Sequence, residues 1–195
     1  MDRETELALV RRLREGDAAA FDAVYEEFRA RLFGFLARLS RRREVAEDLL
    51  EETWLRLVAN ASRLQPETRL GPWLFTVARN LHASYRRSRH LEGEYAASLM
   101  GPWVVAVRQP SPFEETAAGQ LERRVERALA ALPVRSREVL LLAIVEGMTP
   151  SEAARVCGVT PEAMRQRLSR ARALLARELE RDERPGPTAA REVTT

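Results

Sequence analysis

Two helix starts, eleven residues apart near the C-terminal end, constrain the fold of this chain more than any other feature of its sequence. The first is Thr149-Pro150-Ser151-Glu152, which combines a Thr N-cap, Pro at the first helical position and Glu three residues after the cap. The second is Thr160-Pro161-Glu162. Between them lies Cys157-Gly158-Val159, in which Gly158 is free to adopt a positive φ. Two capped helices joined by a glycine turn predict a helix-turn-helix.

The second helix of this pair has the chemistry of a DNA-recognition helix. Between Thr160 and Leu175 it carries four Arg residues and one acid. The N-terminal end of such a helix meets base edges, where Arg bonds to guanine and Gln to adenine. We therefore expect base contacts from Thr160, Glu162, Ala163, Arg165 and Gln166, and phosphate contacts from Arg167, Arg170 and Arg172. A purely structural helical hairpin is the alternative.

The rest of the C-terminal part also predicts helices. One helix, marked by apolar residues from Leu121 to Leu132, should stop at Pro133. Ser136 is expected to cap the next, which holds the apolar run 139–145 and ends at Gly147. Cys157 is the chain's one cysteine, and its position in the helix-turn-helix favours a small buried core residue over a reactive thiol or a metal ligand.

The N-terminal part predicts three helices. Asp17 is a good N-cap for a helix whose apolar residues recur at steps of three and four, from Phe21 to Leu39. A second helix should span about 44–60. On it Asp48, Glu51 and Glu52 share one acidic face, which on its own is most simply a solvated surface.

A third helix is expected over about 72–88, after a loop bounded by Pro66, Gly71 and Pro72. Its outer side holds basic and amide side chains beside aromatic residues, which suits single-stranded nucleic acid because Arg neutralises phosphate and rings stack on bases. Taken alone, an ordinary amphipathic helix explains the same pattern. The outer residues are Thr76, Arg79, Asn80, Ala83, Arg86 and Arg87.

Composition and charge complete the plan. All 32 basic residues are Arg, the net charge is +3, and a stretch rich in Gly, Pro and acids separates two basic segments. We predict an all-α protein with two small helical domains, 1–92 and 120–181, joined by a flexible linker, 93–119, and followed by a disordered tail, 182–195. With one cysteine and two histidines, the chain has few residues that could form a metal site or an active site, and we expect no metal, no cofactor and no enzymatic activity. No apolar run is long enough for a membrane helix, so we expect a cytoplasmic protein.

Three stretches in order give a resemblance to a known family. Ala46–Leu55 and Pro72–Leu81 closely resemble two signature stretches of the extracytoplasmic-function sigma factors of bacterial RNA polymerase, and Glu162–Arg172 is similar to their terminal recognition helix. The chain departs from the pattern at Glu51, where the family usually has Gln, and at Ser84, where it often has Asp.

The resemblance implies a role for each part. The N-terminal domain would dock on the polymerase β′ clamp coiled coil and take the non-template strand of the −10 element, and the C-terminal domain would read the −35 element and touch the β flap. Docking would use Asp48, Glu51, Glu52, Trp54 and Leu55. The −10 contacts would come from the loop around Gln65 and Thr68 and from Arg79, Asn80, Ala83 and Arg86.

An anti-sigma factor is the further partner that the resemblance implies. Two other functions remain open from the residues alone. One is a stand-alone helix-turn-helix regulator that binds duplex DNA without polymerase. The other is an enzyme, for which the scattered histidines and the lack of a glycine-rich phosphate loop give little support.

Overall fold

The computed structural model describes residues 1–91 and 117–183, and all regular elements in these ranges are helices. The all-α prediction is therefore confirmed. The predicted linker lies almost entirely, and the predicted tail very largely, outside the described residues. No helix in the two described ranges is long and apolar enough to span a membrane.

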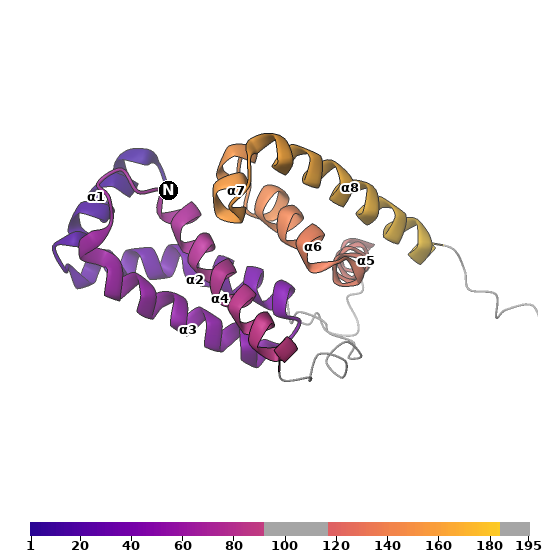
Figure 1. Ribbon diagram of the computed structural model, residues 1–195, viewed down its shortest axis with the longest axis horizontal. Helices are drawn as coiled ribbons and strands as arrows, with labels where there is room; N and C mark the ends of the chain where they lie inside the picture. Colours follow the sequence, from indigo (N-terminus) through magenta and orange to yellow (C-terminus); the bar gives the residue numbers. More distant parts are fainter. Residues whose placement is uncertain (92–116, 184–195) are drawn as a thin grey trace, which may run out of the picture.

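The helices form two groups that lie side by side (Figure 1). We call residues 1–91 the N-terminal unit and residues 117–183 the C-terminal unit. The N-terminal unit holds α1 (Arg3–Arg14), α2 (Ala18–Ser40), α3 (Arg43–Asn60), the short 3-10 helix η1 (Ala61–Arg63) and α4 (Leu70–Leu91). The C-terminal unit holds α5 (Ala117–Ala131), α6 (Val134–Leu140), the π-helical turn η3 (Leu141–Val145), α7 (Pro150–Cys157) and α8 (Pro161–Glu183).

Helix α2 is the centre of the N-terminal unit. The Asp17 carboxylate accepts hydrogen bonds from the backbone N–H groups of Ala19 and Ala20, as its N-cap position predicts. The apolar stripe of α2 is buried, and its Phe35 ring meets Phe75 of α4 edge-on with the centroids 5.2 Å apart. Three helices, α1, α3 and α4, pack around this stripe. Helix α1 was not predicted from the sequence.

The local signals of the helix-turn-helix are confirmed. Thr149 and Glu152 form a reciprocal capping box at the start of α7, and Gly158 ends that helix with φ at 64°. The hydroxyl of Thr160 accepts a hydrogen bond from Ala163 N at 3.2 Å, so α8 is capped as expected. Gly147, with φ at 65°, lies just after the run 139–145.

The predicted cap at Ser136 is wrong. Helix α6 begins at Val134, directly after Pro133, and Pro133 offers no side-chain hydrogen bond to it. The carbonyl oxygen of Pro133 accepts from the N–H groups of Ser136 at 2.9 Å and Arg137 at 3.0 Å, so Pro133 takes the N-cap position and the helix begins three residues earlier than a Ser136 cap requires. Ser136 therefore lies inside α6.

A buried arginine joins the helices of the C-terminal unit. Arg137 of α6 is 2% exposed, and its guanidinium donates to the carbonyl oxygens of Leu129, Ala130 and Leu132, each at 2.8 Å. These carbonyls lie at or just after the C-terminal end of α5, and that of Leu129 also accepts from the N–H of Leu132 at 3.2 Å. A further N–H reaches across to the carbonyl oxygen of Arg38 in α2, also at 2.8 Å. Arg137 thus ties α5, α6 and the N-terminal unit together.

Candidate nucleic-acid and polymerase interfaces

Helix α8 presents its N-terminal end to solvent. The side chains of Thr160, Glu162, Arg165 and Gln166 are exposed, and Ala163 is half-buried. Arg165 Nη2 lies 2.7 Å from Glu162 Oε1, which holds that guanidinium over the first turn of the helix. Further along, Arg170 is exposed and Arg167 is half-buried. The predicted base-reading residues therefore share one accessible surface.

The opposite side of α8 holds the helix in place. Met164 and Ala171 have no exposed surface, and Leu168 is buried, so this stripe packs into the C-terminal unit. Helix α7 packs against α8, and its small residues Ala153 and Ala154 are fully buried. Burial raises the pKa of the Cys157 thiol to about 12, so this group stays a neutral core residue. Among the described residues no cluster of His, Cys, Asp and Glu could hold a metal ion.

Helix α3 carries a second accessible surface. Asp48 and Glu51 are exposed, Glu52 pairs with Arg56 at 2.7 Å, and Leu55 is 56% exposed. Trp54 differs from these, because it is only 7% exposed and its ring packs against Phe21 and Tyr25. The structure thus brings the acidic residues and Leu55 together, and places Trp54 beneath them as support.

Leu55 has an apolar neighbour that sequence reasoning did not assign to this surface. Val58, one turn further along α3, is 61% exposed. Large apolar side chains left in water beside carboxylates are typical of a surface that another protein covers.

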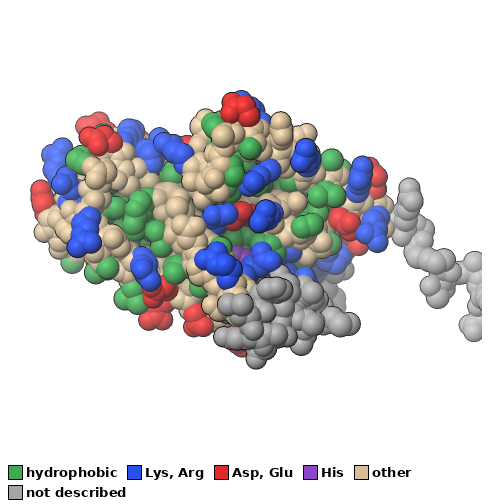
Figure 2. All heavy atoms as spheres, viewed as in Figure 1, with side chains coloured by type: hydrophobic (Ala, Val, Ile, Leu, Met, Phe, Trp, Pro, Cys, Tyr) green, Lys and Arg blue, Asp and Glu red, His purple; other side chains and the backbone are tan. Residues whose placement is uncertain are grey.

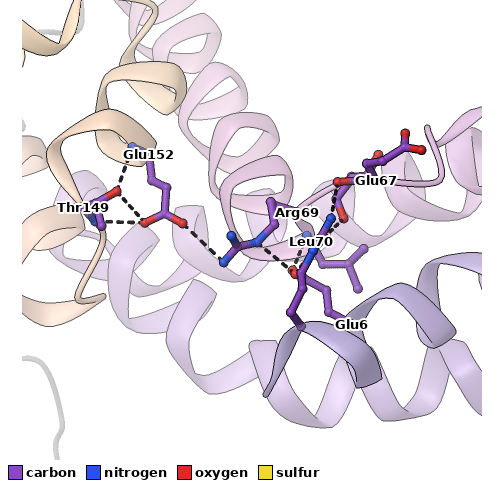
Figure 3. Close-up of polar contacts among 8 residues, drawn as sticks. Glu6, Glu67, Arg69, Leu70, Thr149 and Glu152 are labelled. Atoms are coloured by element: carbon purple, nitrogen blue, oxygen red, sulfur yellow. Dashed lines mark hydrogen bonds and ion pairs between the residues drawn. The ribbon is translucent and has the colours of Figure 1, made fainter.

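The loop before α4 is held from α1, as Figure 3 shows. Gln65 is exposed and Thr68 is half-buried. Arg3 of α1 donates to the carbonyl oxygens of Glu67, at 2.8 Å, and Thr68, at 3.4 Å. The backbone of the loop is thereby fixed while its polar side chains stay accessible.

Glu6 is a functional residue that sequence reasoning missed. Its carboxylate is 8% exposed, accepts from the N–H of Leu70 at 2.8 Å, and pairs with Arg3 at 2.7 Å and Arg69 at 2.9 Å. It therefore caps α4 from a distant helix and sets the direction of Arg69 (Figure 3). The signal was present, since Glu6 is an acid on the same helical face as Leu9, Val10 and Leu13.

We predict that Glu6→Ala lowers the free energy of unfolding by about 2–3 kcal/mol, because the Leu70 N–H and two arginines lose a buried acceptor. Glu6→Gln keeps an acceptor for Leu70 and should cost less. Urea denaturation measures both. Glu4→Ala, an exposed neighbour on α1, is the control and should change stability by less than about 0.5 kcal/mol. An equal loss in Glu4→Ala and Glu6→Ala would contradict the capping role.

The outer side of α4 is not the open surface that its sequence pattern indicates. Arg79 Nε lies 2.8 Å from Glu138 of α6, and the Arg79 side chain is only 26% exposed. Asn80 is exposed and accepts from Arg79 at 3.3 Å. Ala83 and Arg86 are half-buried where the C-terminal unit packs against the helix.

A basic cavity of about 720 Å³ lies along this contact. Arg79, Arg86 and Arg87 of α4 line one side, and Arg135 and Glu138 of α6 line the other. Figure 2 shows Arg side chains gathered at the seam between the two halves of the molecule. The −10 residues predicted on α4 thus lie beside a charged cavity, partly covered.

His82 is buried in the same contact. It is 3% exposed, and burial lowers its pKa to about 4, with the charges of Arg86, Arg137 and Arg79 acting in the same direction. The imidazole is therefore neutral at neutral pH. Its place on α4 shows that the outer side of this helix is a second packing face.

This burial predicts a pH dependence of stability. Between the ordinary pKa of 6.5 and about 4 the unfolded chain binds a proton at His82 that the folded protein does not. Unfolding therefore becomes easier as the pH falls through this range. We expect the parent to lose about 2 kcal/mol more than His82→Leu between pH 7 and pH 5, measured by urea denaturation. Equal losses in the two proteins would contradict the assignment.

Comparison with known proteins identifies both units. The family model of Sigma-70 region 2 matches residues 24–91, and that of Sigma-70, region 4 matches residues 122–175. The chain is 34% identical over 160 residues to RNA polymerase sigma factor CarQ of Myxococcus xanthus, which covers 82% of this chain and 88% of CarQ. It is 36% identical over 150 residues to the ECF RNA polymerase sigma factor EcfG of Rhodopseudomonas palustris, covering 74% and 77%.

The chain is an extracytoplasmic-function sigma factor of the sigma-70 family. Its fold is similar to that of the sigma factor RpoE, solved in complex with the anti-sigma factor NepR from Bartonella quintana. The TM-score is 0.64 at 28% identity, over 82% of this chain and 97% of that one. The similarity extends over the larger part of the chain and is not confined to one helical unit.

Membership of this family decides between the functions that the residues left open. The protein is a specificity subunit of RNA polymerase, which binds the core enzyme and directs transcription initiation through regions 2 and 4. Such factors catalyse no reaction of their own. A stand-alone regulator or an enzyme is therefore no longer needed to explain the helix-turn-helix.

Proposed function

We propose that this sigma factor reads a promoter with two separate surfaces and meets the polymerase with a third. The observation that carries the proposal is that one chain holds the loop and α4 of region 2 together with the exposed start of α8 in region 4. The working parts are residues 1–92 and 120–181, with 93–119 as linker and 182–195 as tail. Its place of action is the cytoplasm, where the core enzyme is.

The first surface is the exposed start of α8, which inserts into the major groove of the −35 element. At this end of α8, Arg165 and Gln166 have side chains that can form bidentate hydrogen bonds with guanine and adenine. They therefore carry most of the base discrimination. Thr160, Glu162 and Ala163 border them, while Arg167 and Arg170 hold phosphates.

We predict that Arg165→Ala or Gln166→Ala weakens binding to the preferred upstream element by about 1–3 kcal/mol and relaxes its sequence preference. Selection from a randomised duplex library with the holoenzyme measures the preference. Arg177→Ala is the control, because this exposed residue lies three helical turns beyond Gln166 on the same helix. An unchanged selected sequence in the Arg165 and Gln166 variants would contradict the assignment.

The second surface takes the single strand of the −10 element. Gln65 and Thr68 lie on a loop whose backbone is fixed by Arg3, so a flipped base can be held there without ordering the loop first. Arg79, Asn80, Ala83 and Arg86 continue the path along α4. Arg79 lies nine residues into the helix, about 14 Å from its start.

The third surface is the α3 face made by Asp48, Glu51, Glu52 and Leu55, with Trp54 beneath it. It docks on the β′ clamp coiled coil, and the C-terminal unit meets the β flap. An exposed apolar centre with carboxylates around it is the usual make-up of a protein interface. The carboxylates select a basic partner.

We predict that the double variant Asp48→Ala/Glu52→Ala weakens binding to core polymerase by about tenfold, since two exposed charge pairs contribute up to ~0.7 kcal/mol each. Fluorescence anisotropy with labelled sigma factor measures the affinity. Asp22→Ala/Glu26→Ala is the matched control, with two exposed acids at the same spacing on α2. Equal affinities of the two double variants would contradict the docking surface.

Transcription from a genomic fragment library tests the function as a whole. Purified protein added to core polymerase should give promoter-dependent transcripts that neither component gives alone. An anti-sigma factor is the further partner we propose, supported by the similarity to RpoE, which was solved with NepR. It would act by covering the surfaces described above.

A further inference from the structure

Four ion pairs between described side chains cross the seam between the two units, and all four have the same polarity. In each, the guanidinium belongs to the N-terminal unit and the carboxylate to the C-terminal unit. The pairs are Arg31–Glu146 at 2.9 Å, Arg38–Glu126 at 2.7 Å, Arg69–Glu152 at 3.3 Å and Arg79–Glu138 at 2.8 Å. We call the four carboxylates Glu126, Glu138, Glu146 and Glu152 the acidic face of the C-terminal unit; Arg135 and Arg137 of α6 lie in the same contact.

Two of these pairs involve residues on the path proposed for the −10 strand. Arg79 belongs to α4, and Arg69 ends the loop that carries Gln65 and Thr68. Glu138 is 9% exposed, so the carboxylate that meets Arg79 is nearly removed from water. A carboxylate at hydrogen-bonding distance from a guanidinium occupies the place that a phosphate oxygen would take.

The Arg69 pair also links the two DNA-reading parts. Glu152 forms the capping box of α7 with Thr149 through one carboxylate oxygen, and its other oxygen pairs with Arg69. The same Arg69 guanidinium also pairs with Glu6 of α1 (Figure 3). The loop of region 2 and the helix-turn-helix of region 4 are thus joined through one guanidinium.

The other two pairs lie away from the proposed DNA path. Arg31 and Arg38 are on α2, which contributes no residue to either promoter surface. Arg38 and Glu126 are both 18% exposed, so this pair is sheltered from solvent screening; Glu146 is 4% exposed, whereas its partner Arg31 is 40% exposed. They can hold the units together without touching a DNA-binding residue.

We propose that the acidic face of the C-terminal unit acts as an intramolecular substitute for the −10 strand. Glu138 and Glu152 occupy Arg79 and Arg69, and the two α2 pairs, together with the bond from Arg137 to the carbonyl oxygen of Arg38, hold this closed arrangement until the units separate. The proposal rests on the proposed function for the role of α4 and its loop. Closure occupies these two arginines of the −10 surface, while Gln65 and Asn80 of that surface and Arg165 and Gln166 of α8 remain exposed.

The first test measures separation of the units in the full-length protein, without DNA or polymerase. Donor and acceptor dyes are attached at Ala23→Cys on α2 and Ala176→Cys on α8, both exposed, while Cys157 is buried. The variant Glu126→Gln/Glu146→Gln removes only the two α2 pairs. Single-molecule energy transfer should show one high-transfer population in the parent and a new low-transfer population in the variant.

A matched control separates closure from net charge. Glu26→Gln/Glu178→Gln removes the same two charges from ion pairs that lie within one unit, Arg29–Glu26 and Arg181–Glu178. It should keep the high-transfer population. Arg38→Glu should open the protein, and Arg38→Glu/Glu126→Arg, which exchanges the charges of the pair, should close it again. Thermal melting followed by circular dichroism confirms that each variant is folded.

The second test uses fluorescent 30-nucleotide DNA of mixed sequence, single-stranded and duplex. Opening should raise the affinity of Glu126→Gln/Glu146→Gln for the single strand by about five- to tenfold over the charge-matched control, while duplex affinity stays within about twofold of it. The asymmetry arises because Arg69 and Arg79 of the −10 surface are paired with carboxylates in the closed form, whereas the start of α8 is exposed.

The outcomes are distinct. Unchanged energy transfer in Glu126→Gln/Glu146→Gln would overturn the closed arrangement, and equal single-strand affinity of the two double variants would overturn the blocking role of Glu138 and Glu152. Neither result depends on polymerase. Failure of the proposed function would appear instead as the absence of promoter-dependent transcripts with core enzyme.

Discussion

The guanidinium of Arg137 is the interaction on which the arrangement of this protein depends. It is buried, and it donates to three carbonyl groups at or just after the C-terminal end of α5. One further bond reaches the backbone of Arg38 in α2, beside the ion pair between Arg38 and Glu126. A planar group with five donors can hold three helices in this way, and a lysine ammonium has neither the reach nor the fixed geometry to do so.

Helix α4 is the element that gains most from this arrangement. One side packs on α2 and α3, through Leu74, Phe75 and Ala78, and the other meets α6 and α7 around His82 and Arg79. The residues that suit single-stranded DNA are therefore also the residues that suit packing against region 4. The surfaces on α3 and α8 do not pack against the other unit in this way, because Leu55, Arg165 and Gln166 face solvent.

Local chemistry explains which predictions were confirmed. The capping residues form hydrogen bonds with backbone groups within four residues of themselves, so their roles follow from the local sequence alone; they are Asp17, Thr149 and Gly158. Ser136 shows the limit of such rules, since Pro133 takes the N-cap position three residues earlier. Glu6 was missed because its partners, Leu70 and Arg69, lie more than sixty residues away in the chain.

The amino-acid sequence by itself determined the helices, the helix-turn-helix and the family, because caps, apolar periodicity and signature stretches are short-range features. Only the tertiary structure decided that Trp54 supports the α3 surface from within and that Glu6 caps the start of α4. It also decided that Arg79 meets a carboxylate. The physical reason is that burial and ion pairing depend on which distant helices meet. The residue type of an Arg on the outer side of α4, and the sequence on either side of it, are the same whether the side chain faces water, DNA or Glu138.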